Sequence, residues 1–214
     1  FRLLQEIYGH CLKPKHTLLK SGRDNTVYGE LMPIFLERLF NEANLVEDSV
    51  FLDLGSGAGN TVAQAALTHR CRSFGIEIRR DVAAIAETML RTAIVRSEIW
   101  GIPIGKMEVV CGDMLQSAEV IEWINTADLV LVNNRIFPSS LNEKIKNLIK
   151  TMKLGAVLVS LVSFQLCGVN RSGAARKGTD DVGAMFEVRQ SHYSSDDISW
   201  SSKGGNYYVH TKIR

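Results

Sequence analysis

The stretch Val50-Phe51-Leu52-Asp53-Leu54-Gly55-Ser56-Gly57-Ala58-Gly59-Asn60-Thr61 decides the fold. A short apolar run ends in a carboxylate, passes through glycines at alternate positions and continues into the helix-compatible residues 62–67. This order predicts a strand, a tight turn and a helix. Glycine suits such a turn because it accepts positive φ and lets a ligand approach the backbone, and the helix start that follows presents free N–H groups.

The glycine spacing and Asp53 separate two classes of cofactor. A dinucleotide-binding turn has the spacing G-x-G-x-x-G and sets a pyrophosphate on the helix start, whereas this chain has G-x-G-x-G after a carboxylate. A carboxylate repels a pyrophosphate but accepts hydrogen bonds from an ammonium group, such as that of S-adenosylmethionine. Glu77 and Asp113 end the next two apolar runs, and Glu77 has the spacing of a carboxylate that receives ribose hydroxyls. The three acids predict a nucleoside ligand at the carboxyl edge of a parallel sheet; an ordinary connecting turn with solvated acids is the structural alternative.

Length and composition suit one α/β domain with an appendage, because the chain has 214 residues and ample apolar content. The formal net charge of +2 is too small to indicate a nucleic-acid binder by itself. The four cysteines lack C-x-x-C spacing, so we expect reduced thiols of an intracellular protein and no zinc site.

No signal peptide or membrane span is visible, and Phe1 in place of an initiator methionine leads us to expect a fragment of a longer protein. Basic residues gather in three segments: Lys13, Lys15, Lys20 and Arg23; Arg70, Arg72, Arg79 and Arg80; Arg171, Arg176 and Lys177.

Residues 1–26 show little periodicity, and we expect them to form an arm that leads into a catalytic domain over residues 27–214. Strands are predicted at about 50–54, 72–76, 108–111, 127–132, 156–162, 185–190 and 207–212. Helices are predicted around 31–39, with Pro33 in the first turn, at 60–69, at 81–100 with Asp81 as its cap, at 117–124, and after a capping box from Ser140 to Glu143. Strands and helices alternate before a terminal strand pair, which predicts a doubly wound sheet with an antiparallel strand inserted at one end.

Six motifs occur in an order that is more specific than any one of them. They are VYGE at 27–30, DLGSGAGN at 53–60, GIE at 75–77, GDM at 112–114, VNN at 132–134 and W-x6-YYVHT at 200–211. From about residue 27 to its end the chain resembles the non-SET histone H3 lysine methyltransferases of the disruptor-of-telomeric-silencing type. The resemblance implies a class I, seven-strand, Rossmann-like methyltransferase fold with an N-terminal helical arm, S-adenosylmethionine as donor with S-adenosylhomocysteine as product, and no metal. It also implies a monomer in the nucleus that acts on a lysine in the globular core of histone H3 within nucleosomes.

The family's functional residues are carried over to the matching positions of this chain. The resemblance assigns donor binding to Val27, Tyr28, Glu30, Asp53, Gly55, Gly57, Asn60, Glu77, Asp113, Met114 and Asn133. Within this set Tyr28 would close over the methionine part, Glu77 would take the ribose hydroxyls, and Asp113 with Met114 would flank the adenine. Catalysis is assigned to Asn133, Phe137, Trp200 and Tyr207. The three aromatic rings would line a narrow channel for the incoming lysine, although packing in the core is the structural alternative. The basic segments would meet DNA phosphates, and no membrane is expected as a partner.

Several residues depart from the family pattern and keep other functions open. Asn60 and Leu31 stand where the family usually has glutamine and threonine, and Arg135 interrupts a run that is otherwise apolar. A cation near the lysine channel would repel the substrate unless its side chain turns outward, so we expect a divergent branch of the family. One alternative is a methyltransferase for RNA, arginine or a small molecule; arginine would favour two glutamates where Asn133 and Asn134 stand. Another is a catalytically silent domain that binds nucleosomes.

Overall fold

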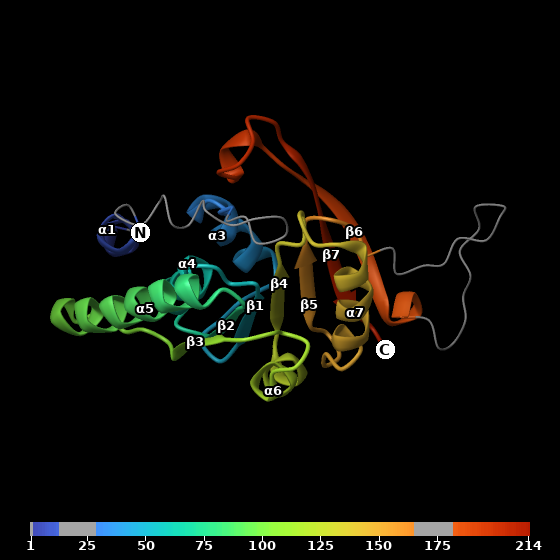
Figure 1. Ribbon diagram of the computed structural model, residues 1–214, viewed down its shortest axis with the longest axis horizontal. Helices are drawn as coiled ribbons and strands as arrows, with labels where there is room; N and C mark the ends of the chain where they lie inside the picture. Colours follow the sequence, from blue (N-terminus) through green and yellow to red (C-terminus); the bar gives the residue numbers. More distant parts are fainter. Residues whose placement is uncertain (1, 13–28, 165–181) are drawn as a thin grey trace.

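The computed structural model describes residues 2–12, 29–164 and 182–214 (Figure 1). Its centre is a seven-stranded sheet in the order β3-β2-β1-β4-β5-β7-β6. The strands are β1 (Val50–Leu54), β2 (Arg72–Glu77), β3 (Met107–Cys111), β4 (Leu129–Val132), β5 (Val157–Ser160), β6 (Phe186–Tyr193) and β7 (Gly205–Lys212). Strands β1 to β5 pair in parallel, whereas β7 runs antiparallel between β5 and β6. The predicted doubly wound sheet with an inserted antiparallel strand is therefore confirmed.

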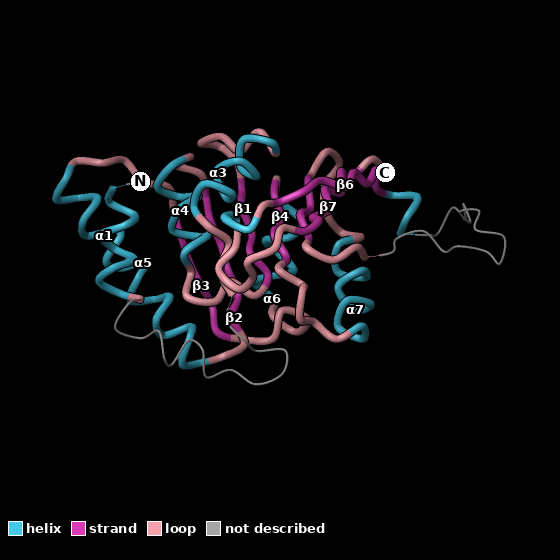
Figure 2. Tube along the Cα trace, turned by 90° about the horizontal axis from the view of Figure 1, so that it is seen from above, coloured by secondary structure: helices cyan, strands magenta, loops and turns pink. Residues whose placement is uncertain are grey.

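Helices flank the strands (Figure 2). They are α1 (Arg2–Cys11), α3 (Pro33–Glu42), α4 (Asn60–Thr68), α5 (Arg80–Trp100), α6 (Ala118–Thr126) and α7 (Ser139–Ile149), with short 3-10 turns η3 (Val182–Met185) and η4 (Ser195–Asp197). Buried side chains of α6 and α7 share one hydrophobic cluster with the sheet, and those of α4 and α5 share another with α1. Helix α3 packs in a third cluster with β7. The two faces of the sheet are thus covered by different helices.

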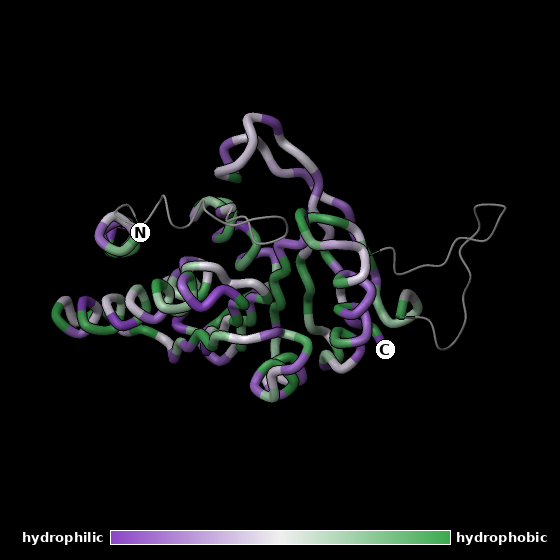
Figure 3. Tube along the Cα trace, in the orientation of Figure 1, coloured by the Kyte–Doolittle hydropathy of each residue, from purple (hydrophilic) through white to green (hydrophobic). Residues whose placement is uncertain are grey.

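Strand β1 lies in the middle of this arrangement, and its five residues are all buried. Burial on both faces explains its continuous apolar run, which is typical of parallel sheets covered by helices. Val50, Leu52 and Leu54 join the cluster of α6 and α7, while Phe51 joins that of α3. The alternation turns Asp53 to the side of α4, where it meets Thr61. Hydropathy follows the same plan, with hydrophobic residues concentrated along β4 and β5 (Figure 3).

The N-terminal segment packs more closely than its sequence suggests. Helix α1 lies within the residues expected to form an arm, and its side chains at Leu3, Leu4 and Ile7 are buried in one cluster with residues of α4 and α5. The N-terminal helical arm that the resemblance implies is present as α1, although the apolar spacing of this stretch was not recognised in the sequence. An apolar face of only four side chains, Leu3, Leu4, Ile7 and Cys11, is a weak signal until a partner helix is present to bury it.

Two predicted helix caps were wrong. The residue that caps α5 is Arg79, and Asp81 is the second residue of the helix, where its carboxylate accepts a hydrogen bond from the Arg79 side chain. Helix α7 follows Pro138 as its cap, with no side-chain cap bond, so Ser140 already has helical backbone. A cap needs extended backbone just before the first turn, which Arg79 and Pro138 adopt. Pro33 does occupy the first turn of α3, as predicted.

Candidate active site

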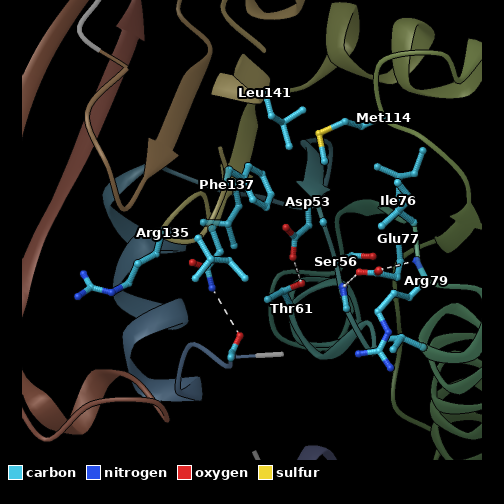
Figure 4. A pocket seen from close by; sticks show the side chains of 18 of the residues that line it. Asp53, Ser56, Thr61, Ile76, Glu77, Arg79, Met114, Arg135, Phe137 and Leu141 are labelled. Carbon is cyan, nitrogen blue, oxygen red and sulfur yellow. Dashed lines mark hydrogen bonds between the residues drawn. The ribbon is translucent and has the colours of Figure 1, made fainter. Parts of the chain in front are cut away.

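A cavity of about 530 Å³ opens at the carboxyl ends of the parallel strands. Four neighbouring strands contribute polar side chains to its lining: Asp53 from β1, Glu77 from β2, Asp113 after β3 and Asn133 after β4. Figure 4 shows Asp53 and Glu77 close to the glycine turn, with Met114 and Leu141 on another side of the cavity. The acids predicted from successive strand ends therefore lie in one pocket, as expected of the carboxyl edge of an open α/β sheet.

The floor of the cavity is the glycine turn between β1 and α4. Gly55, Gly57 and Gly59 all have positive φ, at 92°, 54° and 78°. The backbone N–H groups of Gly55 and Ser56 both donate to the carbonyl of Ile76, at 3.0 and 2.9 Å, which ties the turn to β2. A side chain on Gly55 would enter the space before Phe137, whose Cζ lies 3.4 Å from the position of an added Cβ. The turn thus leaves room that any other residue would fill.

Glu77 anchors the turn from the neighbouring strand. Its Oε2 accepts a hydrogen bond of 3.0 Å from the N–H of Gly57, and its Oε1 accepts one of 2.8 Å from the N–H of Arg79. Burial raises the pKa of the Glu77 carboxyl, and the two backbone donors act in the opposite direction. Each carboxylate oxygen has a further lone pair, so the group can still accept ligand hydroxyls. Glu77 therefore holds the turn as well as lining the cavity.

Asp53 is the most deeply buried acid of the cavity, with 3% of its surface exposed. Burial raises the pKa of its carboxyl to about 7; the hydrogen bond from Thr61 lowers it and the nearby charge of Glu77 raises it. The Thr61 hydroxyl donates to Asp53 Oδ2, as the dashed line in Figure 4 shows. A cationic ligand group beside Asp53 would favour its ionised form.

The opposite wall of the cavity carries Asn133 and two aromatic rings. Phe137 and Trp200 both line the cavity, and the side-chain amide of Asn133 donates to the carbonyl of Gly29 over 3.5 Å. The Trp200 ring lies so close to Gly29 that an added Cβ there would be 2.7 Å from its Cε3 atom. Here the absence of a side chain on Gly29 permits the contact.

This wall joins segments that are distant in the sequence. Leu31 forms an antiparallel bridge with Ile198, the N–H of Met32 donates to the carbonyl of Asp197, and the N–H of Glu30 donates to Ser199 Oγ at 2.9 Å. Glu30 also accepts a hydrogen bond from the hydroxyl of Tyr8 on α1. Residues 30–32, which border the cavity, are thus fixed in place by hydrogen bonds to residues 197–199 and to Tyr8 of α1.

The side chain of Arg135 turns away from the glycine turn. Figure 4 shows its guanidinium extending to the side opposite Asp53, and Nη1 donates to the hydroxyl of Tyr193 over 3.4 Å. The outward orientation that a lysine channel would require is therefore the one observed. The guanidinium charge therefore lies beside Tyr193 of β6, where it repels an incoming cation less than it would if the side chain pointed towards Asp53.

Tyr207 lies outside the lining of the cavity. Its ring is 4% exposed, packs edge-on against Phe35 at 5.3 Å between centroids, and its hydroxyl donates to Glu42 at 3.0 Å. These contacts correct the placement of Tyr207 in a lysine channel: the alternation along β7 directs its side chain to α3, and the structure supports the core alternative. Phe137 and Trp200 remain beside Asn133.

Some predicted site residues lie outside the described part of the chain. Val27 and Tyr28 belong to this group, as do the basic residues Arg171, Arg176 and Lys177. Within the described ranges, no three His, Cys, Asp or Glu side chains gather as potential metal ligands. Among the described helices, none combines the length and the apolar character needed to cross a bilayer.

The structure adds two residues that the sequence analysis did not assign. Thr61, on the first turn of α4, meets Asp53. Asn134 is 1% exposed; its amide donates to Asn142 and to the carbonyl of Val162, and its Oδ1 accepts from the N–H groups of Leu161 and Val162. Thr61 could have been found from the spacing of a residue in the first helical turn after the strand end. No local signal identifies the partners of Asn134, because two of them lie in the turn that follows β5.

Comparison with solved structures shows the class to which the fold belongs. The chain is similar to an O-methyltransferase from Bacillus cereus in complex with S-adenosylhomocysteine, with a TM-score of 0.60, 13% identity, and coverage of 99% of this chain and 91% of the other. It is also similar to an RNA methyltransferase from Salinibacter ruber in complex with S-adenosyl-L-homocysteine, with a TM-score of 0.56, 21% identity, and coverage of 86% and 94%. The fold is that of the class I S-adenosylmethionine-dependent methyltransferases.

Sequence comparison then gives the family. The family described as "Histone methylation protein DOT1" matches residues 8–212, and the chain belongs to it. Relatives named "Histone-lysine N-methyltransferase, H3 lysine-79 specific" are 39% identical in Aspergillus fumigatus and 33% identical in Yarrowia lipolytica, each over 214 residues and 99% of this chain. The chain spans 42% and 43% of the length of these two relatives.

Proposed function

We propose that this chain is the catalytic domain of an S-adenosylmethionine-dependent histone lysine N-methyltransferase that acts on the globular core of histone H3. The observation that carries the proposal is the composition of one cavity: acids from three successive strand ends on one side, and Asn133 with two aromatic rings on the other. The first set suits an adenosyl amino acid, and the second suits the alkyl chain of a lysine. Membership of the DOT1 family gives the choice of histone as substrate.

The residues present fit the donor. Glu77 offers lone pairs for ribose hydroxyls, Asp113 and Met114 line the cavity and would flank the adenine, and Asp53 offers a buried carboxylate to an ammonium group. The positive φ at Gly55 keeps the backbone open to close approach. When bound, the donor supplies a methyl group on a cationic sulfonium. The cavity volume of about 530 Å³ falls in the ordinary range for small-molecule sites.

The protein's part in the reaction is alignment and exclusion of water. With donor and substrate bound, the residues of the cavity would hold the lysine nitrogen in line with the methyl group that the donor supplies. The amine must first lose a proton, and an aromatic, desolvated path favours its neutral form. Phe137 and Trp200 would supply such a path, and Arg135, which also lines the cavity, turns its guanidinium towards Tyr193 and away from Asp53. Asn133 would orient the reacting groups through its amide.

The wider setting of the reaction is also a proposal. A core lysine of histone H3 is presented by the assembled nucleosome, so the enzyme should prefer nucleosomes to free histone. The basic segments around Lys13 and Arg176 would meet DNA phosphates, and such contacts weaken as salt increases. We propose that the enzyme acts as a monomer in the nucleus.

A direct assay tests this function. The protein is incubated with labelled S-adenosylmethionine and with intact nucleosomes, free histone H3 or RNA, and the modified site is mapped by mass spectrometry. We expect label on a single core lysine of H3 in nucleosomes, and little on free histone. Glu77→Ala should abolish labelling, while Glu187→Ala on the exposed face of β6 serves as the matched control and should not. Label on RNA would support the alternative methyltransferase, and donor binding without transfer would support a silent domain.

A further inference from the structure

Thr61 and Asp53 form a buried pair at the base of the cavity. Asp53 is 3% exposed and Thr61 is 6% exposed, and both line the pocket. The hydroxyl of Thr61 donates to Asp53 Oδ2 (Figure 4). The strand-turn-helix connection sets this contact, because Asp53 precedes the glycine turn on β1 and Thr61 follows it on α4. The pair belongs to the part of the cavity that the proposed function gives to the donor's amino-acid group.

The surroundings of Asp53 oppose its ionisation. Burial raises the pKa of the carboxyl to about 7, and the neighbouring charge of Glu77 acts in the same direction. The Thr61 hydroxyl acts against both, since a hydrogen bond donated to a carboxylate stabilises its charged form. Other charged side chains that line the cavity are Glu30, Glu77, Arg79, Asp113, Arg135 and Lys144. Of these, Arg79 pairs with Asp81 and Arg135 turns towards Tyr193.

We propose that Thr61 is a positioning residue for the donor: its hydroxyl holds Asp53 as an oriented carboxylate and leaves Oδ1 to accept from the ammonium group of the ligand. This inference rests on the proposed function and adds a residue that sets donor affinity. Thr61 acts through Asp53, so its effect should appear only with ligands that carry the ammonium group. It should also depend on pH, because a proton on Asp53 competes with the ligand.

Substitution by valine separates the hydroxyl from the shape of the side chain. Thr61→Val keeps two branches on Cβ but removes the donor, so the carboxylate loses the bond that favours its charge. The pKa of Asp53 should rise further, and donor binding should weaken most where Asp53 is then protonated. Thr61→Ser keeps the hydroxyl and should retain affinity. Thr68→Val is the matched control, because Thr68 closes the same helix and its hydroxyl donates to the carbonyl of Gln64.

The test is calorimetric titration from pH 6 to pH 9 with two ligands. S-adenosylhomocysteine carries the ammonium group, whereas 5′-methylthioadenosine has the same nucleoside and sulfur without the amino-acid part. We expect Thr61→Val to weaken S-adenosylhomocysteine binding on the order of tenfold at pH 7, the size expected for a hydrogen bond to a charged group. The loss should shrink towards pH 9. Binding of 5′-methylthioadenosine should stay within about twofold of wild type, a difference too small to reflect a lost hydrogen bond.

Each other outcome decides against the inference. Equal affinity of Thr61→Val and wild type for S-adenosylhomocysteine across the pH range would overturn it. Equal losses for both ligands would assign Thr61 a structural role in the turn, as would failure of Thr61→Ser to retain affinity. A wild-type protein that binds neither ligand would instead refute the proposed function, from which this inference follows. The two failures are therefore distinguishable.

Discussion

Replacing Asp53 by asparagine should stabilise the ligand-free protein at alkaline pH while removing donor binding. The carboxyl has an ordinary pKa of 3.8, which burial raises to about 7 in the folded protein. Between these two values the folded state holds a proton that the unfolded state has lost, so the free energy of unfolding falls as pH rises. Above pH 7 the full cost of the buried charge is present, and below pH 4 it is absent.

The magnitude follows from the separation of the two pKa values. Each pKa unit corresponds to about 1.4 kcal/mol, so the rise from 3.8 to about 7 amounts to ~4 kcal/mol at most. The asparagine side chain in this variant could still accept the hydrogen bond from Thr61, but its NH₂ group would need an acceptor, at a cost of about 1–2 kcal/mol. We therefore expect Asp53→Asn to be more stable than wild type by about 2–3 kcal/mol at pH 8 and slightly less stable at pH 4.

Urea unfolding of both proteins at pH 4, 5, 6, 7 and 8 measures this difference. The comparison between variants is essential because other groups also titrate. The pKa of buried His210 is lowered to about 4 by desolvation, so this residue contributes a slope of the opposite sign, with stability lost as pH falls from about 6.5 to 4. Asp48→Asn, at an exposed position, is the matched control and should leave the pH dependence unchanged. Parallel curves for wild type and Asp53→Asn would refute the reasoning.

Three further predictions concern the rest of the site. Tyr207→Phe removes the hydrogen bond to Glu42 and should lower the free energy of unfolding by about 1 kcal/mol in urea titration, with methyl transfer unchanged; an inactive but folded variant would return Tyr207 to the channel. Asn134→Ala leaves one buried and one partly buried N–H group without their acceptor and should cost about 3 kcal/mol, more than Asn142→Ala, which removes one partner of the amide. Equal losses in thermal unfolding would argue against the role of Asn134. Gly55→Ala and Gly155→Ala both place alanine at positive φ, so each should lower the free energy of unfolding by about 1 kcal/mol. Only the Cβ added at Gly55 enters the cavity, so only Gly55→Ala should weaken donor binding measured by calorimetry. If Gly55→Ala binds the donor as tightly as Gly155→Ala does, the turn can accommodate a Cβ beside the ligand.

Much of the donor side of the site could be predicted from local patterns. The bounds of β1 were predicted to the residue, because a strand buried on both faces reads as a short apolar run that ends at a glycine turn. Asp53, Glu77 and Asp113 end successive parallel strands, and parallel strands bring their carboxyl ends to one edge. The family resemblance rested on the order of motifs and was confirmed by the match over residues 8–212.

The remaining features depend on contacts between distant segments, which no local pattern encodes. The sequence shows that alternate side chains of β7 point to opposite faces of the sheet. It does not show which face Tyr207 is on, because that depends on the packing of α3 against the strand. The wall that carries Trp200 exists because residues 29–32 pair with 197–199, across most of the chain. Likewise, the sequence alone determined that Asp53 would be a carboxylate beside a glycine turn and within reach of Thr61 on the following helix, whereas the tertiary structure decided how deeply Asp53 is buried and how close it lies to Glu77. Burial, the hydrogen bond from Thr61 and the nearby Glu77 together determine the pKa of the Asp53 carboxyl, because desolvation and neighbouring groups act through space.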